Sequence, residues 1–295
     1  MEEADARPSK KARRPGAGSG LTLFALRLAK QLSEDGSSGD NLVFSPLSIY
    51  AALALVAAGA GGETLDEFLA LLGAASCDEL AEFVRGMAES ALTDRSVSGG
   101  PLVAFACGFW HQETLALRPA YRAPPWSPTR PRRAPPISSR RGSTKGDKQR
   151  NWVSKATNKL ITSIHPKRSV KPSTALVFAN AIYFKGKWSK PFEQEKTKDR
   201  EFYCLGGSRV HGGTAHRGAR RLPYRNSDER TRFSMCFFLP DARDGLPGLV
   251  DKMTSSFSSF LRDHLPKRRV KVGEFLLPKT VFVPTLPFLF PVASA

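Results

Sequence analysis

The side chains that could do metal chemistry are scattered along this chain of 295 residues. No histidine has a zinc-ligand spacing to a cysteine or a carboxylate. Two of the histidines lie in a basic stretch, 211–225, with little apolar patterning, and we expect them to be solvated loop residues. The sequence therefore predicts no metal site. The five histidines are His111, His165, His211, His216 and His264.

Motifs for nucleophilic, acid–base and phosphate chemistry do not occur either. The glycine-rich run GAGGET at 59–64 lacks the Lys-Ser/Thr pair that a phosphate-binding loop uses. There is no GxSxG nucleophile elbow, and no GxGxxG opens a helix after a strand. The adjacent carboxylates Asp66-Glu67 and Asp228-Glu229 stand at positions where we expect solvent exposure. We therefore expect a protein that is not an enzyme and needs no cofactor.

The cysteines and the first residues bear on the compartment. Cys77, Cys107, Cys204 and Cys236 show no paired spacing, which is typical of reduced thiols. The opening MEEADARPSKKARRPGAGSG has no apolar signal-peptide core, and no apolar window reaches the roughly 18 residues of a membrane span. We expect an intracellular protein of the cytoplasm or nucleus. The basic cluster 10–14 fits a nuclear address and a solvated arm equally well.

The formal net charge of +18 is unevenly distributed. Residues 1–20 contribute +2, residues 123–150 contribute +7 and residues 211–232 contribute +4. The segment 123–150 contains six prolines and almost no aliphatic residues, so it cannot bury enough apolar surface to offset its ordering entropy. Residues 127–150 also lack aromatic side chains for base stacking. We do not expect nucleic acid as a partner, although a basic nuclear or nucleic-acid-associated binding protein stays an alternative.

The elements that would position a site begin with helices. Apolar residues repeat on one helical face over 21–32, and Ser45-Pro46 is a typical helix start before an apolar run that reaches Gly59. Capping boxes predict two further helices, one opened by Thr64 with Glu67 and one opened by Ser76 with Glu79. A helical stripe also covers 151–164, and a short one covers 246–253.

Strand patterns become frequent later in the chain. Val103, Phe105, Cys107 and Phe109 alternate with smaller residues, and 174–184 is almost continuously apolar, as in a strand buried on both faces. Further strands are predicted at 42–44, 232–239 and 268–277. Helices followed by mixed helices and strands, without βαβ alternation, indicate an α+β fold.

Three stretches resemble the serpin family, and specifically its plant branch. They are NLVFSPLSIYAALALVAAGAGGETLDEFLALLG, then NWVSKATNKLITSI with TALVFANAIYFKGKW, and finally RLPYRNSDERTRFSMCFFLPDARDGLPGLVDKM through VGEFLLPK. The matching parts extend over 21–122, 151–210 and 220–279. The motif NAIYFKGKW, together with the NLVFSPLSI block in the same order, is highly specific.

The resemblance implies a single α+β domain in which N-terminal helices pack on a dominant five-stranded sheet, accompanied by a second sheet. We expect a disordered basic arm at 1–20 and a serpin-like domain at 21–279, interrupted by an irregular basic segment at 123–150. We expect a divergent tail at 280–295, so that the fold is incomplete at its C-terminal end.

The resemblance also implies a mechanism and positions for it. Family members inhibit proteases with an exposed reactive-centre loop, which is cleaved and then inserts as a new strand into the main sheet. By position, Ser45 and Ser48 fall at the start of the family's shutter helix, Asn180 falls on the central strand at the shutter, and Trp188 falls at the breach. Simple N-capping by Ser45 and simple core packing by Trp188 remain compatible with these roles.

The bait machinery that the family needs is not found. After Pro278-Lys279 the sequence reads TVFVPTLPFLFPVASA, without a Glu-Gly-Thr and alanine-rich hinge. LPFLF within it has a faint likeness to a C-terminal serpin strand. We expect a truncated member of the serine protease inhibitor class that does not inhibit, is monomeric or aggregated, and has a serine or cysteine protease as its family-level partner. A gene relic without function is a further alternative.

Overall fold

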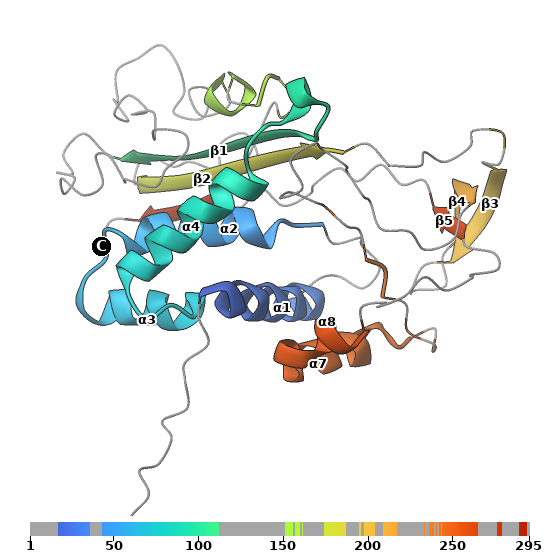
Figure 1. Ribbon diagram of the computed structural model, residues 1–295, viewed down its shortest axis with the longest axis horizontal. Coiled ribbons are helices and arrows are strands. Elements are labelled where there is room, and N and C mark those ends of the chain that lie inside the picture. The colour runs from blue at the N-terminus through green and yellow to red at the C-terminus, as the bar shows by residue number, and fades with distance from the viewer. Residues whose placement is uncertain are drawn as a thin grey trace, which may run out of the picture.

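The computed structural model describes residues 17–35, 43–111, 151–155, 157–159, 161, 174–186, 195, 198–203, 209–216, 233, 236–238, 240, 242, 244–264, 276–278 and 289–293. The predictions for residues 1–16, 123–150, Trp188 and Cys204 lie outside these residues. Within them, helices pack beneath a β-sheet and a second sheet lies to one side, which confirms the predicted α+β class (Figure 1).

The N-terminal part of the described chain is helical, as predicted. It contains α1 (Ala17–Asp35), α2 (Pro46–Ala57), α3 (Gly62–Leu72), α4 (Cys77–Ala91) and the short 3-10 helix η1 (Ser96–Ser98). α1 begins at Ala17, four residues before the expected start of the folded domain at 21. Residues 43–45 precede α2 without strand structure, so the strand predicted at 42–44 is not observed at 43–44.

One of the two predicted capping boxes is confirmed and the other is wrong. The hydroxyl of Ser76 accepts the Glu79 N–H at 3.2 Å, and the Glu79 carboxylate accepts the Ala75 N–H at 2.7 Å. In α3, by contrast, the N-cap is Gly61 and the helix starts at Gly62, whose φ is +57°. Thr64 therefore lies inside α3 rather than at its cap, because the two glycines let the chain turn into the helix earlier.

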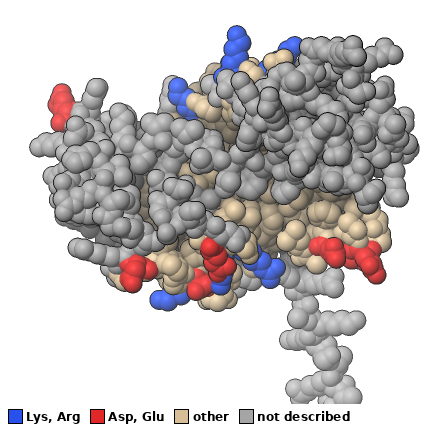
Figure 2. Space-filling view, turned by 180° about the vertical axis from the view of Figure 1, so that it is seen from behind, with Lys and Arg blue, Asp and Glu red and all other residues tan. Residues whose placement is uncertain are grey.

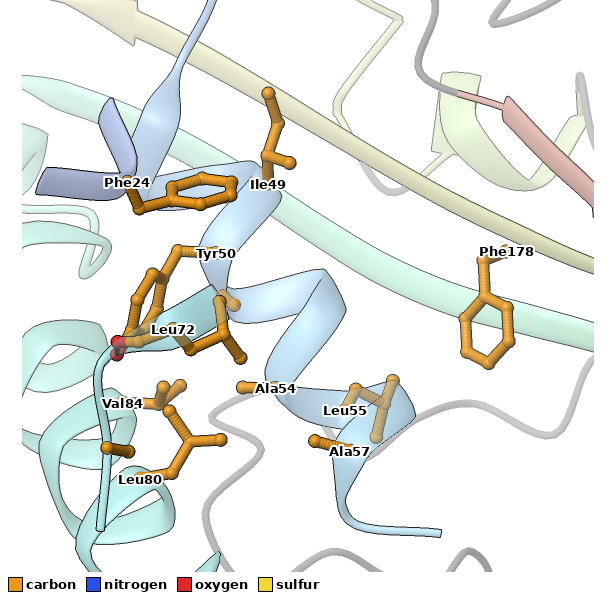
Figure 3. Packing of buried hydrophobic residues seen from close by; sticks show 12 residues of the cluster. Phe24, Ile49, Tyr50, Ala54, Leu55, Ala57, Leu72, Leu80, Val84 and Phe178 are labelled. Atoms are coloured by element: carbon orange, nitrogen blue, oxygen red, sulfur yellow. Dashed lines mark hydrogen bonds between the residues drawn. The ribbon is translucent and has the colours of Figure 1, made fainter. Parts of the chain in front are cut away.

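The core forms around α2, which contacts α1, α3, α4 and β2 (Thr174–Lys185). Tyr50 is at its centre with no exposed surface, and its ring makes edge contacts with Phe24 and Phe83 at centroid distances of 5.8 and 5.7 Å. The Tyr50 hydroxyl donates to the Leu72 carbonyl at 2.8 Å. Figure 3 shows this contact and Phe178, which reaches the core from β2. A buried tyrosine thus has its polar end satisfied.

The strands form two three-stranded sheets within the described residues. The first has the order β1-β2-β6, formed by β1 (Leu102–His111), β2 and β6 (Leu289–Ala293), and all its pairs are antiparallel. The second has the order β3-β4-β5, formed by β3 (Lys198–Tyr203), β4 (Arg209–His216) and β5 (Leu276–Pro278). In Figure 1, α2 lies between the first sheet and α1.

Two helices from the second half of the chain pack against α1, in the first half. α7 (Leu246–Ser255) forms where the stripe at 246–253 predicts it, and α8 (Phe257–His264) follows it directly. The Lys30 ammonium of α1 lies 2.7 Å from the Asp251 carboxylate of α7. α7 and α8 both contact α1, which ties the two parts of the sequence together.

The helix predicted at 151–164 is observed at 151–155 but not at 157–159 or at 161. Helical structure covers 151–155, and a turn follows in which Asn158 and Lys159 have φ of 51° and 64°. The Thr157 hydroxyl donates to the Val153 carbonyl at 2.7 Å and accepts the Ile161 N–H at 3.0 Å. In a continued helix the Ile161 N–H would bond to the backbone carbonyl of Thr157. Its bond to the Thr157 hydroxyl replaces that backbone bond and so helps to end the helix.

The remaining differences concern strands. The stretch that was expected to be irregular contains β4, so His211 and His216 lie on a strand and not in a loop. Residues 233 and 236–238 belong to no strand, contrary to the prediction for 232–239. Of the strand predicted at 268–277, the described part is β5, at 276–278. Within the tail at 280–295, which was expected to be divergent, the described residues 289–293 form β6 and pair with β2.

Candidate functional site

The candidate site begins at the N-terminus of α2. Ser45 is the N-cap, and its hydroxyl accepts the Ser48 N–H at 3.3 Å, while Pro46 takes a position where no amide donor is needed. The capping expected of Ser45 is thus confirmed. Ser48 lies three residues into this turn and is only 3% exposed, so the cap fixes the backbone of a buried polar residue.

Asn180 reaches this turn from the sheet. It lies in the middle of β2, opposite Cys107 of β1. Its amide nitrogen donates to the Ser48 carbonyl and to the Ser48 hydroxyl, both at 2.7 Å. The two residues are 132 positions apart in sequence. An amide NH2 group carries two hydrogens, so both bonds can form at once.

The contact between Asn180 and Ser48 is a mechanical link rather than a reactive centre. It joins a neutral amide to a neutral hydroxyl and a carbonyl, and no general base accompanies them in the described contacts. It connects α2 to the middle strand of the first sheet, so the two cannot separate without losing both bonds. Ser45, Ser48 and Asn180 thus meet, whereas Trp188 is outside the described residues.

Within the described part of the chain, no group of three or more metal-ligating side chains occurs. The described cysteines, Cys77, Cys107 and Cys236, form no disulfide. Burial, assisted by the charge of Asp78, raises the pKa of the Cys77 thiol, which disfavours the reactive thiolate. None of the described helices has the length and apolarity needed to cross a bilayer.

The charge on the visible surface is mixed. In Figure 2, acidic side chains stand beside Lys and Arg along the lower edge of the described surface. Of the three basic segments, 123–150 lies outside the described residues and 1–20 lies largely outside them. The third, 211–232, is described at 211–216, within β4.

Sequence reasoning missed the pairing of β6 with β2. The tail is apolar but contains prolines at 284, 287 and 291, and a proline cannot donate a hydrogen bond within a central strand. Among the described strands, β6 lies at the edge of the first sheet, where a proline is tolerated. The likeness of LPFLF to a serpin strand was the one signal available.

Comparisons with known proteins agree with this architecture. A family model described as Serpin (serine protease inhibitor) matches residues 19–286. Serpin-Z2B of Oryza sativa subsp. japonica is 50% identical in an alignment of 297 positions, which covers 88% of this chain and 70% of that protein. Serpin-Z2A of the same rice is 48% identical over 88% of this chain and 71% of its own length.

Solved structures give the same assignment. The Arabidopsis AtSerpin1 structure, in its native stressed conformation, superposes with a TM-score of 0.76 at 32% identity and covers 89% of this chain and 70% of its own. Emu ovalbumin, with a TM-score of 0.64 and 21% identity over 90% of this chain and 73% of its own, shares the fold. The family match over most of the chain and the rice relatives together show that this chain belongs to the serpin family, whose class is that of the serine protease inhibitors.

Proposed function

We propose that this chain is a serpin of the serine protease inhibitor class that does not itself trap a protease. The observation that carries the proposal is the spacing between β5 and β6. β5 ends at Pro278 and β6 begins at Leu289, so only residues 279–288 lie between them. They contain no Glu-Gly-Thr and alanine-rich hinge and are too few for a strand, a hinge and an exposed bait loop.

The Asn180–Ser48 link supports a shutter role that is independent of inhibition. We propose that Ser45, Ser48 and Asn180 hold α2 against the sheet, as the resemblance implies, and that Trp188 has the breach role. In an inhibitory relative such a link would have to yield when the sheet opens. In this chain it stabilises the attachment of α2 to the middle strand of the first sheet.

The test is incubation of the 295-residue chain with trypsin-like and chymotrypsin-like serine proteases and with a papain-like cysteine protease. We expect no SDS-stable covalent complex and undiminished protease activity. A serpin that forms such a complex with the same proteases serves as the positive control. A covalent complex that resists SDS, or stoichiometric loss of protease activity, would contradict the proposal.

We further propose that the chain acts inside the cell, in the cytoplasm or nucleus, and that it has no enzymatic activity. The compartment can be tested with a fluorescent protein fused to its C-terminus. Replacing the basic cluster at 10–14 by alanine separates the two remaining interpretations. Loss of nuclear signal in that variant supports a nuclear address, and an unchanged distribution supports a solvated arm.

We also propose that the chain tends to self-associate. Phe184 of β2 and Leu71 of α3 are 46% and 44% exposed, and exposed apolar side chains favour association. Size-exclusion chromatography over a range of concentrations tests this. A monomer peak that does not shift with concentration would contradict it.

A further inference from the structure

The turn between α4 and β1, residues 92–101, is a feature that the proposed function does not use. Its tip is η1, where Val97 is 102% exposed and the neighbouring Ser96 and Ser98 are also exposed. Gly99, with a φ of 83°, ends η1 in the left-handed conformation and turns the chain back toward β1. The Ser98 side chain is therefore at the surface, at the tip of a tight turn.

The base of this turn is held separately from its tip. The Asp94 carboxylate accepts the Val103 N–H at 3.4 Å, and the Arg95 N–H donates to the Pro101 carbonyl at 3.2 Å. At the tip, the Ser98 N–H and the Ser98 hydroxyl both donate to the Arg95 carbonyl, at 3.1 and 3.0 Å. Solvent-exposed bonds of this kind open at low free energy, so η1 can extend without unfolding α4 or β1.

Arg95 stands three positions before Ser98 and supplies the positive charge of this turn. Its Nη2 atom donates to the Glu89 carbonyl at 3.3 Å. Its Nε atom is buried and has no hydrogen-bond partner among the described residues. A buried N–H without a partner is costly, and a phosphate oxygen is a strong acceptor for a guanidinium group. The Arg95 side chain thus has a donor available for an anion that forms within the turn.

Ser33 and Ser255 also follow a basic residue by three positions, but in a different setting. Each lies in the last turn of an α-helix, α1 or α7, and its hydroxyl donates to a carbonyl of that helix, at 2.7 and 2.8 Å. Lys30, which precedes Ser33, is also paired with Asp251 at 2.7 Å. A protein kinase binds its substrate segment extended and reads its charge pattern. Extending the chain at Ser33 or Ser255 breaks α-helical bonds, whereas at Ser98 it breaks only the bonds of the tip.

We propose that Ser98 is a phosphorylation site for a protein kinase that reads an arginine three positions before the serine. In the reaction, the Ser98 oxygen bonds to the γ-phosphorus of ATP, the bond from that phosphorus to the β,γ-bridging oxygen breaks, and the hydroxyl proton passes to the catalytic carboxylate of the kinase. ADP leaves, and the turn gains about 1.5 to 2 negative charges, which pair with the Arg95 guanidinium. This inference goes beyond the proposed function, since it holds whether or not the chain traps a protease.

The first test uses the full chain with Mg²⁺, ATP and a purified calcium/calmodulin-dependent protein kinase, a class that reads this arginine position. Mass spectrometry of the phosphopeptides should show phosphate on Ser98 at a rate about tenfold or more above that on Ser33 and Ser255. Assignment by site also separates Ser98 from Ser143, which follows Arg140 by three positions. Absence of phosphate on Ser98, or equal rates on Ser33 or Ser255, would overturn the proposal.

Variants of Arg95 separate recognition by the kinase from an effect on the fold. Arg95→Ala should lower the rate at Ser98 by about tenfold or more, and Arg95→Lys by less, because lysine keeps the charge without the planar fork. A synthetic peptide of residues 91–101 carries the same sequence outside the fold. The same substitution should lower its phosphorylation equally. An effect of Arg95→Ala in the full chain alone would show that Arg95 acts through the fold, and would overturn the recognition.

The last test concerns the pairing of the phosphate with Arg95. In nitrogen-15 NMR spectra, the Nε–H resonance of Arg95 should shift when Ser98 is phosphorylated, whereas those of Arg27 in α1 and Arg85 in α4 should not. Ser98→Ala, treated with the same kinase, controls for phosphate at other sites and should leave the Arg95 resonance unchanged. An unshifted Arg95 resonance in the chain phosphorylated at Ser98 would overturn the pairing.

Discussion

The link between Asn180 and Ser48 can be measured with a double-mutant cycle. The variants are Asn180→Ala, Ser48→Ala and the double substitution. Asn180→Ala removes two neutral hydrogen bonds, both 2.7 Å long. A neutral hydrogen bond contributes about 0.5–1.5 kcal/mol, so we expect a loss of about 2 kcal/mol in the free energy of unfolding. Ser48→Ala removes the bond to the hydroxyl and leaves the bond to the Ser48 carbonyl.

The cycle therefore isolates the bond between the Asn180 amide and the Ser48 hydroxyl. In the Ser48→Ala background, Asn180→Ala should cost about 1 kcal/mol less than in the unaltered chain. Urea unfolding followed by circular dichroism gives each free energy, provided that the denaturant slope stays the same.

The matched control is Ser90→Ala, on an exposed face of α4, where the hydroxyl donates to the Gly86 carbonyl. It should change stability by less than about 0.5 kcal/mol and should be additive with Asn180→Ala. A coupling energy near zero between Ser48 and Asn180 would refute the interpretation that this contact holds α2 to the sheet.

Three further perturbations test the helix group. Gly20→Ala places a methyl group against the Leu72 carbonyl and 3.0 Å from the Gly73 Cα, so an overpacking cost of about 1–3 kcal/mol should exceed the gain of about 1 kcal/mol in helix propensity. Gly86→Ala meets no atom within 4 Å and should gain the helix propensity alone. Equal melting temperatures for the two variants would contradict the close contact at Gly20. Burial first, and the charge of Glu79 second, raise the pKa of Tyr50 to about 12. Because the unfolded chain ionises near pH 10, the stability that this tyrosine contributes is present below pH 10 and lost between pH 10 and 12, by at most about 2.7 kcal/mol. Urea midpoints across that range should fall less steeply for Tyr50→Phe, and parallel curves would refute the assignment. Ser76→Ala should lower the free energy of unfolding by about 1 kcal/mol through loss of the α4 cap, whereas an unchanged urea midpoint would mean that the cap does not matter.

Local signals in the sequence predicted local structure well. Ser45-Pro46 and Ser76 with Glu79 gave correct helix starts, because a capping hydroxyl and its amide lie within three residues of each other. The alternation in β1 and the apolar run in β2 also gave correct strands, because both patterns are read from consecutive residues. The failure at Thr64 is also local, since the preceding glycines offered a competing start that the capping-box pattern does not consider.

Edge and polar strands were the poorly predicted part of the fold. β4 has little apolar pattern, yet it pairs with β3 on one side and with β5 on the other. β6 contains a proline and still pairs with β2. Backbone hydrogen bonds to neighbouring strands define such elements, and these neighbours are far away in sequence, so no short window carries the information.

By itself, the sequence determined the family, the α+β class and the buried character of α2, because motif identity and apolar periodicity are written in consecutive residues. It placed Ser48 and Asn180 at the family's shutter positions only through resemblance. The tertiary structure decided that they touch, that Tyr50 closes the core against Leu72, and that β6 lies along β2. Each of these contacts joins residues that are 22 or more positions apart, and packing of the whole domain brings them together.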